Sequence, residues 1–237
     1  MKLLIFSDVH GNRYAFDEFL KEIREIEYDY MVFCGDIFGY YYDQKYIFDA
    51  LCQIPHLIWL KGNHDQYFLQ AYEGDLDEKE LIERYGHSYH HVRQKYSEEM
   101  YIKISQLPDQ VELMLEGHKI GIFHGTPEHA LMGRLYPQDL IEHQELYQIY
   151  DIIILGHTHF FMRRYIAESN TLIINPGSLG QPRDGAGSSY LVLNIESGQV
   201  ENHTIFYDNT ELYSKIDLYD ADLKKLKEVL ERRRKDN

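Results

Sequence analysis

Histidine, aspartate and asparagine side chains follow five short apolar segments of this chain, directly where each segment ends. In chain order these groups are Asp8 and His10, then Asp36, then Asn63 and His64, then His124, and finally His157 and His159. Each apolar segment is typical of a buried strand, and functional groups gather outside the carboxyl ends of strands in open α/β sheets. We therefore expect these side chains to converge at one edge of a sheet.

The types of side chain at these positions indicate a metal site. Imidazole, carboxylate and amide oxygen, without thiolate, suit Mn, Fe, Zn, Co or Ni better than an iron–sulfur or structural zinc site. The seven candidate ligands are Asp8, His10, Asp36, Asn63, His124, His157 and His159. They are too many for one ion, and with one bridging carboxylate they suit two divalent ions about 3.5–4 Å apart. Such a pair generates hydroxide at neutral pH and holds a phosphoryl group for in-line displacement.

The elements that must position these groups alternate between strand and helix in the first third of the chain. Strands are predicted at Lys2–Phe6, Tyr30–Cys34 and His56–Leu60, with helices from Arg13 to about Glu27 and over Tyr46–Leu51 between them. This alternation favours a parallel layer of βαβ units.

The stretch 66–106 differs from its surroundings because it is charged, rich in Tyr, Glu and Lys, and without a strand pattern. We interpret it as a mainly helical insertion or lid beside the main layers. After Pro108, the segments VELML and KIGIF around Glu116-Gly117 predict a β-hairpin.

The second half of the chain is expected to add further strands. A helix over Gln138–Tyr150 is predicted to lead into a strand at Asp151–Leu155, and more β structure is expected before a C-terminal helix at 219–235. No linker rich in proline and glycine divides the chain, so a single domain over 1–237 is predicted.

Composition narrows the function classes. The chain of 237 residues has 39 acidic and 24 basic residues and a formal charge of -15. Such a surface repels nucleic-acid backbones, and the basic run Lys224–Lys235 is interpreted as the solvated face of the terminal helix. Neither a stretch of roughly 18 apolar residues nor a signal-peptide pattern is found, so we expect a cytoplasmic protein without membrane or stable nucleic-acid partners. Cys34 and Cys52 do not make a disulfide framework, and exposed strand edges permit a homodimer.

Six motifs in a fixed order carry a resemblance to a known family. SDVHGN, GDIFGYYYD, GNHD, HGTP, GHTH and NPGSLGQPRDG resemble those of the calcineurin-like metallophosphoesterase superfamily, closest to its small bacterial phosphodiesterase branch. The resemblance extends from Met1 to about Phe206 and is weakest across 66–106. It implies an α/β fold with four layers, an α/β/β/α sandwich, and a dimetal site on one edge.

The resemblance also implies a role for each residue of the site. Asp8, His10 and His159 would bind one ion, Asp36 would bridge both, and Asn63, His124 and His157 would complete the second site. Manganese is favoured, with iron, zinc, cobalt or nickel as alternatives. A hydroxide bridging the two ions would attack phosphorus, and His64 would protonate the leaving oxygen. Asp65 would orient or polarise His64 or contact the substrate.

Several further residues have two interpretations. Asn12 is expected to cap the first helix, with a substrate contact as the alternative. Arg183 can grip a phosphate through its planar guanidinium or form a surface salt bridge. Tyr40–Tyr42 stand where the family often has GYGPDP, and they either stack on a substrate or pack as an aromatic cluster. Three histidines of the insertion either line the mouth of the site or lie on a helix surface: His87, His90 and His91.

The expected function is a metal-dependent phosphodiesterase that hydrolyses small organic phosphodiesters or nucleotides. Hydrolysis of dinucleoside polyphosphates or other pyrophosphates is the nearest alternative. A phosphomonoesterase, protein phosphatases included, is a further one. A binding module that keeps the fold without catalysis is disfavoured, because every expected ligand is present.

Overall fold

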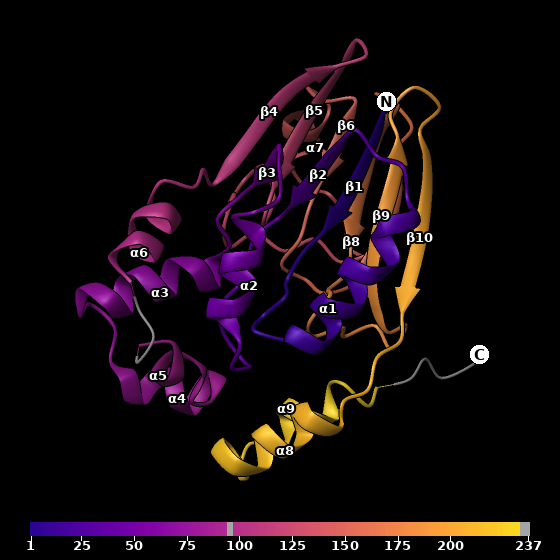
Figure 1. Ribbon diagram of the computed structural model, residues 1–237. Coiled ribbons are helices and arrows are strands. Elements are labelled where there is room, and N and C mark those ends of the chain that lie inside the picture. The colour runs from indigo at the N-terminus through magenta and orange to yellow at the C-terminus, as the bar shows by residue number, and fades with distance from the viewer. Residues whose placement is uncertain (94–96, 233–237) are drawn as a thin grey trace.

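Two five-stranded mixed sheets face each other in the computed structural model, which describes residues 1–93 and 97–232 (Figure 1). The first sheet has the order β10-β9-β1-β2-β3. Its strands are β1 (Lys2–Phe6), β2 (Tyr30–Phe33), β3 (Leu57–Trp59), β9 (Ser188–Asn194) and β10 (Gln199–Ile205). Strands β1, β2 and β3 are parallel, as the βαβ pattern predicts, whereas β9 and β10 are antiparallel to their neighbours.

The second sheet has the order β4-β5-β6-β8-β7. Its strands are β4 (Gln110–Leu115), β5 (His118–Phe123), β6 (Ile152–Ile154), β7 (Phe161–Ile166) and β8 (Thr171–Pro176). Strands β4 and β5 pair antiparallel as the predicted hairpin, and β5, β6 and β8 are parallel.

Helices cover the outer faces of both sheets. They are α1 (Arg13–Glu22, followed by the 3-10 turn η1, Ile23–Glu25), α2 (Gln44–Leu51), α3 (Asn63–Glu73), α4 (Glu78–Tyr85), α5 (Ser88–Arg93), α6 (Glu98–Ser105), α7 (Gln144–Tyr147), α8 (Thr210–Tyr219) and α9 (Lys225–Glu228). Helices α4, α5 and α6 and most of α3 lie in the stretch 66–106, which the sequence predicts as a helical insertion. Among the described residues no helix is both long and apolar enough to cross a membrane.

The core consists of one apolar layer between the sheets and one on each outer face. Side chains such as Ile5 and Val32 of the first sheet meet Ile122, Ile154 and Ile174 of the second. The opposite faces pack against helices, in a large cluster around β1, α1 and α2 and a smaller one beside α7. The expected α/β/β/α sandwich is therefore confirmed.

Two predicted helices are wrong in their bounds. Within Gln138–Tyr150 only α7 is helical, because Asp139 turns back to accept a hydrogen bond from the Tyr136 amide and Arg164 binds the carbonyl oxygens of both residues. The helix expected at 219–235 is instead the end of α8 and the short α9, and 233–235 lie outside the described residues. Helix α8 stops at Asp220, whose side chain is buried in a polar cluster.

Candidate metal centre

All seven predicted ligands lie at the carboxyl ends of β1, β2, β3, β5 and β6, and all are buried. Strand β1 runs toward the edge of the molecule where α4, α5, α8 and α9 gather (Figure 1). Three overlapping groups each hold ligand atoms within 4.8 Å of one another: Asp8, His10 and His159; Asp36, His124 and His157; and His10, Asp36 and His64. The seventh residue, Asn63, places its Oδ1 3.0 Å from His124 Nε2.

Main-chain carbonyl groups orient three of the histidine rings. The Nδ1 atoms of His10, His124 and His159 lie 2.6, 2.8 and 2.7 Å from the carbonyl oxygens of Phe38, Cys34 and Gln181. A carbonyl oxygen can only accept, so each Nδ1 carries a proton and donates it. The Nε2 atoms are left with lone pairs, as histidines that bind a metal through Nε2 require.

These lone pairs point at one another and at carboxylate oxygens. Nε2 of His10 lies 3.1 Å from Nε2 of His159, and Asp8 Oδ1 lies 3.2 Å from the latter. Asp36 Oδ2 is 3.3 Å from His124 Nε2 and 3.8 Å from His10 Nε2, so it lies between the two clusters. Among the described residues neither Asp8 Oδ1 nor Asp36 Oδ2 has a hydrogen-bond partner. Facing lone pairs and unpartnered buried carboxylate oxygens fit bound cations.

The acidity of the groups is consistent with ligand roles. Burial would raise the pKa of Asp8, but the neighbouring His159 and His10 hold it well below its usual value. Burial lowers the pKa of His157 to about 3 and that of His159 to about 4, so both imidazoles stay neutral. Burial also opposes a charge on His124, but the Asp36 carboxylate outweighs it and raises the pKa of His124 to about 9. Without a metal, His124 therefore holds a proton on Nε2 that a bound cation would displace.

The backbone is strained where it presents the ligands. Asp8, His10, Asp36, His157 and His159 have φ angles of 56°, 49°, 68°, 65° and 62°, in the left-handed region. This conformation costs a residue other than glycine about 1–2 kcal/mol. Such strain persists where the surrounding structure over-determines it, as at functional sites. Here hydrogen bonds between the loops, such as those from Val9 and His10 amides to the Asp36 carbonyl, hold the turns.

Asp65 supports the loop of Asp36 rather than His64, which corrects the role expected from the sequence. Its carboxylate accepts hydrogen bonds from the backbone amides of Gly62, Asp36 and Ile37 at 2.9 Å each. Burial and the Asp36 charge together raise the pKa of Asp65 to about 6. Position 62, whose amide binds Asp65, requires glycine, because a Cβ there would lie 2.1 Å from Asp36 Oδ1.

His64 lies beside the ligands and is surrounded by tyrosines. Its ring centroid is 4.9 Å from that of His10, 5.0 Å from Tyr40 and 4.5 Å from Tyr85 of the insertion. Its Nδ1 atom lies 2.8 Å from the hydroxyl of Tyr89, also of the insertion. Burial lowers the pKa of His64 well below its usual value. Sequence patterns gave no signal for these tyrosines beyond the high Tyr content of 66–106.

Two arginines border the clusters, one on each side. Arg183 donates to the Tyr40 hydroxyl and to Gln181 Oε1, both at 2.9 Å, and its charge acts on His159. Arg134, which no sequence motif marks, donates from Nε to His157 Nε2 at 3.0 Å. No described carboxylate pairs with either guanidinium, so the surface salt bridge considered for Arg183 is not found.

The remaining predicted positions have structural partners. Asn12 caps α1, since its Oδ1 accepts from the Ala15 amide, and its Nδ2 donates to the Gly180 carbonyl and the Tyr207 hydroxyl. Tyr41 and Tyr42 are buried in an aromatic cluster with α8 and α9. The insertion histidines lie away from the ligands: His87 contacts Asp220, His90 contacts Glu78, and His91 packs on Tyr219.

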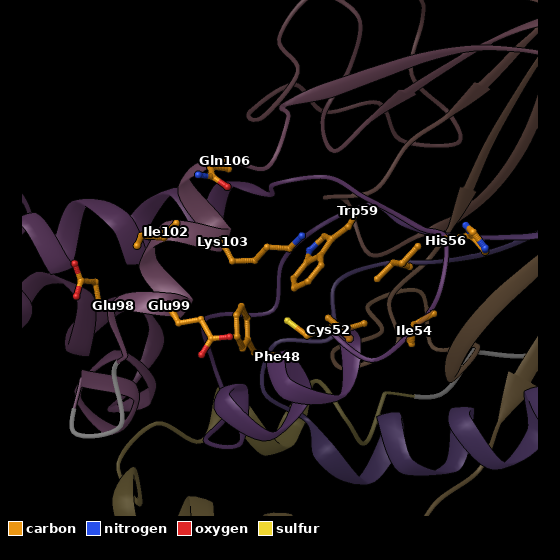
Figure 2. A pocket seen from close by; sticks show the side chains of 12 residues that line it. Phe48, Cys52, Ile54, His56, Trp59, Glu98, Glu99, Ile102, Lys103 and Gln106 are labelled. Carbon is orange, nitrogen blue, oxygen red and sulfur yellow. The ribbon is translucent and has the colours of Figure 1, made fainter.

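A separate cavity of about 700 Å³ lies between α2, β3 and α6 (Figure 2). Phe48, Leu51 and Trp59 form much of its wall, and Lys103 extends toward the Trp59 ring, 5.6 Å from the ring centroid. Within the described part of the chain, none of the seven ligands lines this cavity. The chemistry of the ligand clusters is therefore not located there.

A buried set of imidazoles and carboxylates at the carboxyl edge of an α/β/β/α sandwich defines a metal-binding protein of the metallophosphoesterase fold. The family model of the calcineurin-like phosphoesterase superfamily domain matches residues 1–198. The chain therefore belongs to this family, as the sequence motifs indicated.

Comparisons with individual proteins agree with this assignment. The chain is 25% identical to an uncharacterised protein of Methanocaldococcus jannaschii, MJ0912, over 90% of this chain and 91% of that one. Its fold matches hypothetical protein PH1004 from Pyrococcus horikoshii with a TM-score of 0.79 and 15% identity, over 97% of both chains. It matches a metallophosphoesterase from Sphaerobacter thermophilus with a TM-score of 0.74 and 23% identity, over 98% and 99% of the chains. At these identities the structural matches show the shared fold.

Proposed function

We propose that this protein is a metal-dependent phosphodiesterase that hydrolyses small organic phosphodiesters, nucleotides among them. The proposal rests on two carboxylate oxygens that have no partner among the described residues, Asp8 Oδ1 and Asp36 Oδ2. Three histidine Nε2 atoms surround these oxygens, and the His64 ring lies beside that of His10. Manganese is the favoured metal, and two ions are expected because Asp36 Oδ2 lies between the clusters.

Divalent ions held by these residues would supply a water-derived nucleophile at neutral pH and neutralise charge on the phosphoryl group. The protein contributes a ligand set that needs little rearrangement, because carbonyl groups already fix the rings of His10, His124 and His159. The pKa of Asp8 and of Asp36 lies below its usual value, where histidine neighbours outweigh the effect of burial, so both carboxylates stay charged.

Arg134 and Arg183 are proposed to bind the non-bridging phosphate oxygens. Both guanidiniums lack a carboxylate partner in the described structure although the chain has a formal charge of -15. A planar guanidinium makes two parallel hydrogen bonds to a phosphate, which fixes its orientation as well as adding affinity.

His64 is proposed to protonate the leaving oxygen. An alkoxide leaving group of a diester is a poor one, and an acid in position typically contributes 10²–10⁴-fold, on the order of several kcal/mol in the barrier. Hydrolysis of dinucleoside polyphosphates is the second candidate. It is favoured by the placement of Arg134 beside one cluster and Arg183 beside the other, which suits a substrate with more than one phosphate.

The test compares three substrates with manganese-loaded protein: bis(4-nitrophenyl) phosphate, 4-nitrophenyl phosphate and diadenosine tetraphosphate. Turnover of the first without the second supports the diesterase, and preference for the third supports the second candidate. The variants Asp36→Asn and His64→Ala should both lose activity. Equal residual turnover in the wild type and both variants would remove the mechanism, and metal binding without turnover of any ester would favour a non-catalytic binding module.

A further inference from the structure

His64 is held by a residue from a distant part of the chain. The Tyr89 hydroxyl of α5 lies 2.8 Å from His64 Nδ1 and 3.2 Å from the main-chain carbonyl oxygen of His64. Tyr89 is only 2% exposed, so water does not compete for this contact. The insertion therefore touches the acid of the proposed reaction through a buried hydroxyl group.

The number of available protons defines which group donates in each of the two hydrogen bonds of the Tyr89 hydroxyl. A phenol has one proton, and the carbonyl oxygen of His64 can only accept, so the Tyr89 proton goes to that carbonyl. The contact to Nδ1 is then a bond in which the imidazole donates and the tyrosine oxygen accepts. This contact fixes the tautomer of His64 with a proton on Nδ1, so Nε2 is the nitrogen that can exchange a proton with the substrate.

Neighbouring groups restrict the rotation of the His64 ring. Gly39 passes so close that a Cβ there would lie 2.4 Å from His64 Nδ1. The Tyr85 ring stands edge-on against the imidazole with ring centroids 4.5 Å apart, and His10 stands edge-on at 4.9 Å. Asp65 does not contribute, because the described hydrogen bonds that its carboxylate accepts all come from backbone amides.

We propose that Tyr89 is a positioning residue for His64, so that the helical insertion completes the acid of the active site. This inference rests on the proposed phosphodiesterase function. In the reaction a water-derived oxygen forms a bond to phosphorus, the P–O bond to the leaving group breaks, and the electron pair of that bond goes to the leaving oxygen. The free imidazole is neutral, because burial lowers the pKa of His64, and it takes up a proton from water on Nε2 when the anionic phosphodiester binds. The leaving oxygen takes this Nε2 proton. The imidazole becomes neutral, and its Nδ1–H group stays hydrogen-bonded to the Tyr89 oxygen throughout.

The kinetic test uses Tyr89→Phe, which keeps the ring and removes only the hydroxyl. Two substrates differ in their need for an acid: 4-nitrophenyl methyl phosphate releases a stable phenolate, whereas phenyl methyl phosphate releases a more basic one. We expect kcat for the phenyl ester to fall about 10–100-fold, the usual range for a residue that orients a catalytic group. The nitrophenyl ester should change little, and KM for both should stay near the wild-type value.

The matched control is Tyr101→Phe, which removes another hydroxyl of the insertion. The Tyr101 hydroxyl bonds Glu73, away from His64, so neither substrate should be affected. An equal fall for both esters in Tyr89→Phe, or no fall for either, would overturn the proposal.

A second measurement does not depend on turnover. In protein labelled with 15N-histidine and without metal, the His64 signals are those missing from His64→Asn. We expect the wild type to show the Nδ1-protonated tautomer and Tyr89→Phe a mixture of both tautomers. A wild type with the proton on Nε2 overturns the inference even if diesters are hydrolysed, whereas the expected tautomer in a protein that hydrolyses no diester contradicts only the proposed function.

Discussion

The ligand clusters and the cover above them are built in different ways. We use "cover" for the parts of α4, α5, α8 and α9 that pack on His64 and on Tyr40–Tyr42. Each ligand follows a strand end, and main-chain amides and carbonyls of neighbouring loops hold it in place. The cover is joined to the sandwich mostly by hydroxyl, carboxylate and ring contacts of side chains.

Asp220, at the end of α8, is the centre of the cover. Its carboxylate accepts a hydrogen bond from the Tyr42 hydroxyl at 2.6 Å, from the His87 amide at 3.0 Å and from His87 Nδ1 at 2.7 Å. It thereby connects the C-terminal helices to the insertion and to the loop after Asp36. The Tyr41 hydroxyl adds a bond to the Leu226 carbonyl.

This difference in construction suggests that the ligand clusters and the cover have separate roles. Main-chain hydrogen bonds fix the ligands within a layer that the sandwich requires anyway, so metal binding should depend little on the cover. The cover should instead affect stability and the handling of the leaving group.

Asp36→Asn should abolish the response to metal. The amide keeps the shape of the side chain but removes the charge from the unpartnered Oδ2 between the clusters. In the wild type, metal at a thousandfold excess over Kd should stabilise the fold by about 4 kcal/mol, seen as a rise in Tm that EDTA reverses. In the variant this rise should vanish, and turnover should fall on the order of 10²–10³-fold. A metal-induced rise equal to that of the wild type would contradict the assignment.

Gly39→Ala should impair turnover while metal binding persists. Gly39 has a φ of 85°, and an added Cβ would lie 2.4 Å from His64 Nδ1, so the ring must leave Tyr89. We expect about 1–2 kcal/mol of backbone strain and a loss of kcat on the order of 10²-fold for poor leaving groups. Calorimetric titration with manganese and kinetics on phenyl and nitrophenyl diesters measure both parts. Loss of metal affinity here would show that the two regions are not separable.

Asp220→Asn should lower stability and spare the metal site. Removing the charge from the buried carboxylate weakens three hydrogen bonds that it accepts, so the free energy of unfolding in urea should fall by about 1.5–3 kcal/mol. The control is Asp217→Asn on the same helix, an exposed carboxylate that pairs with Lys227 and should change stability little. Equal losses in the two variants, or a lower affinity for manganese in Asp220→Asn, would argue against the division.

The residues of the ligand clusters could be predicted because the sequence features that place them are local. A strand end, a turn residue and a ligand occur within a few positions, as in Asp8 and His10 or His157 and His159. The four layers of the sandwich were implied by the family resemblance, and the strand pattern alone did not predict them. All seven expected ligands meet in the structure. The strain at Asp8 and Asp36 was not visible, since a φ angle depends on partners far along the chain.

The cover could not be predicted in this way. Tyr89 and Arg134 have no periodicity or motif that separates them from other tyrosines and arginines, and only long-range packing brings them to His64 and His157. Asp65 shows the opposite error. Its place next to His64 suggested a contact between the two, but on the first turn of α3 the carboxylate faces backbone amides, as an acidic residue near a helix N-terminus often does.

Lys215→Ala should have the smallest effect and defines what holds the cover. Lys215 Nζ pairs with Asp43 at 2.6 Å, and the side chains are 31% and 15% exposed, so solvent screens the pair more than the buried bond from Tyr42 to Asp220. We expect a loss of no more than about 1 kcal/mol in the free energy of unfolding, reduced further in 1 M salt. A double-mutant cycle with Asp43→Ala isolates the pair from the contact of Lys215 with the Tyr14 ring. A coupling larger than the loss in Asp220→Asn would mean that surface charge, rather than the buried Asp220 cluster, attaches the C-terminal helices to the sandwich.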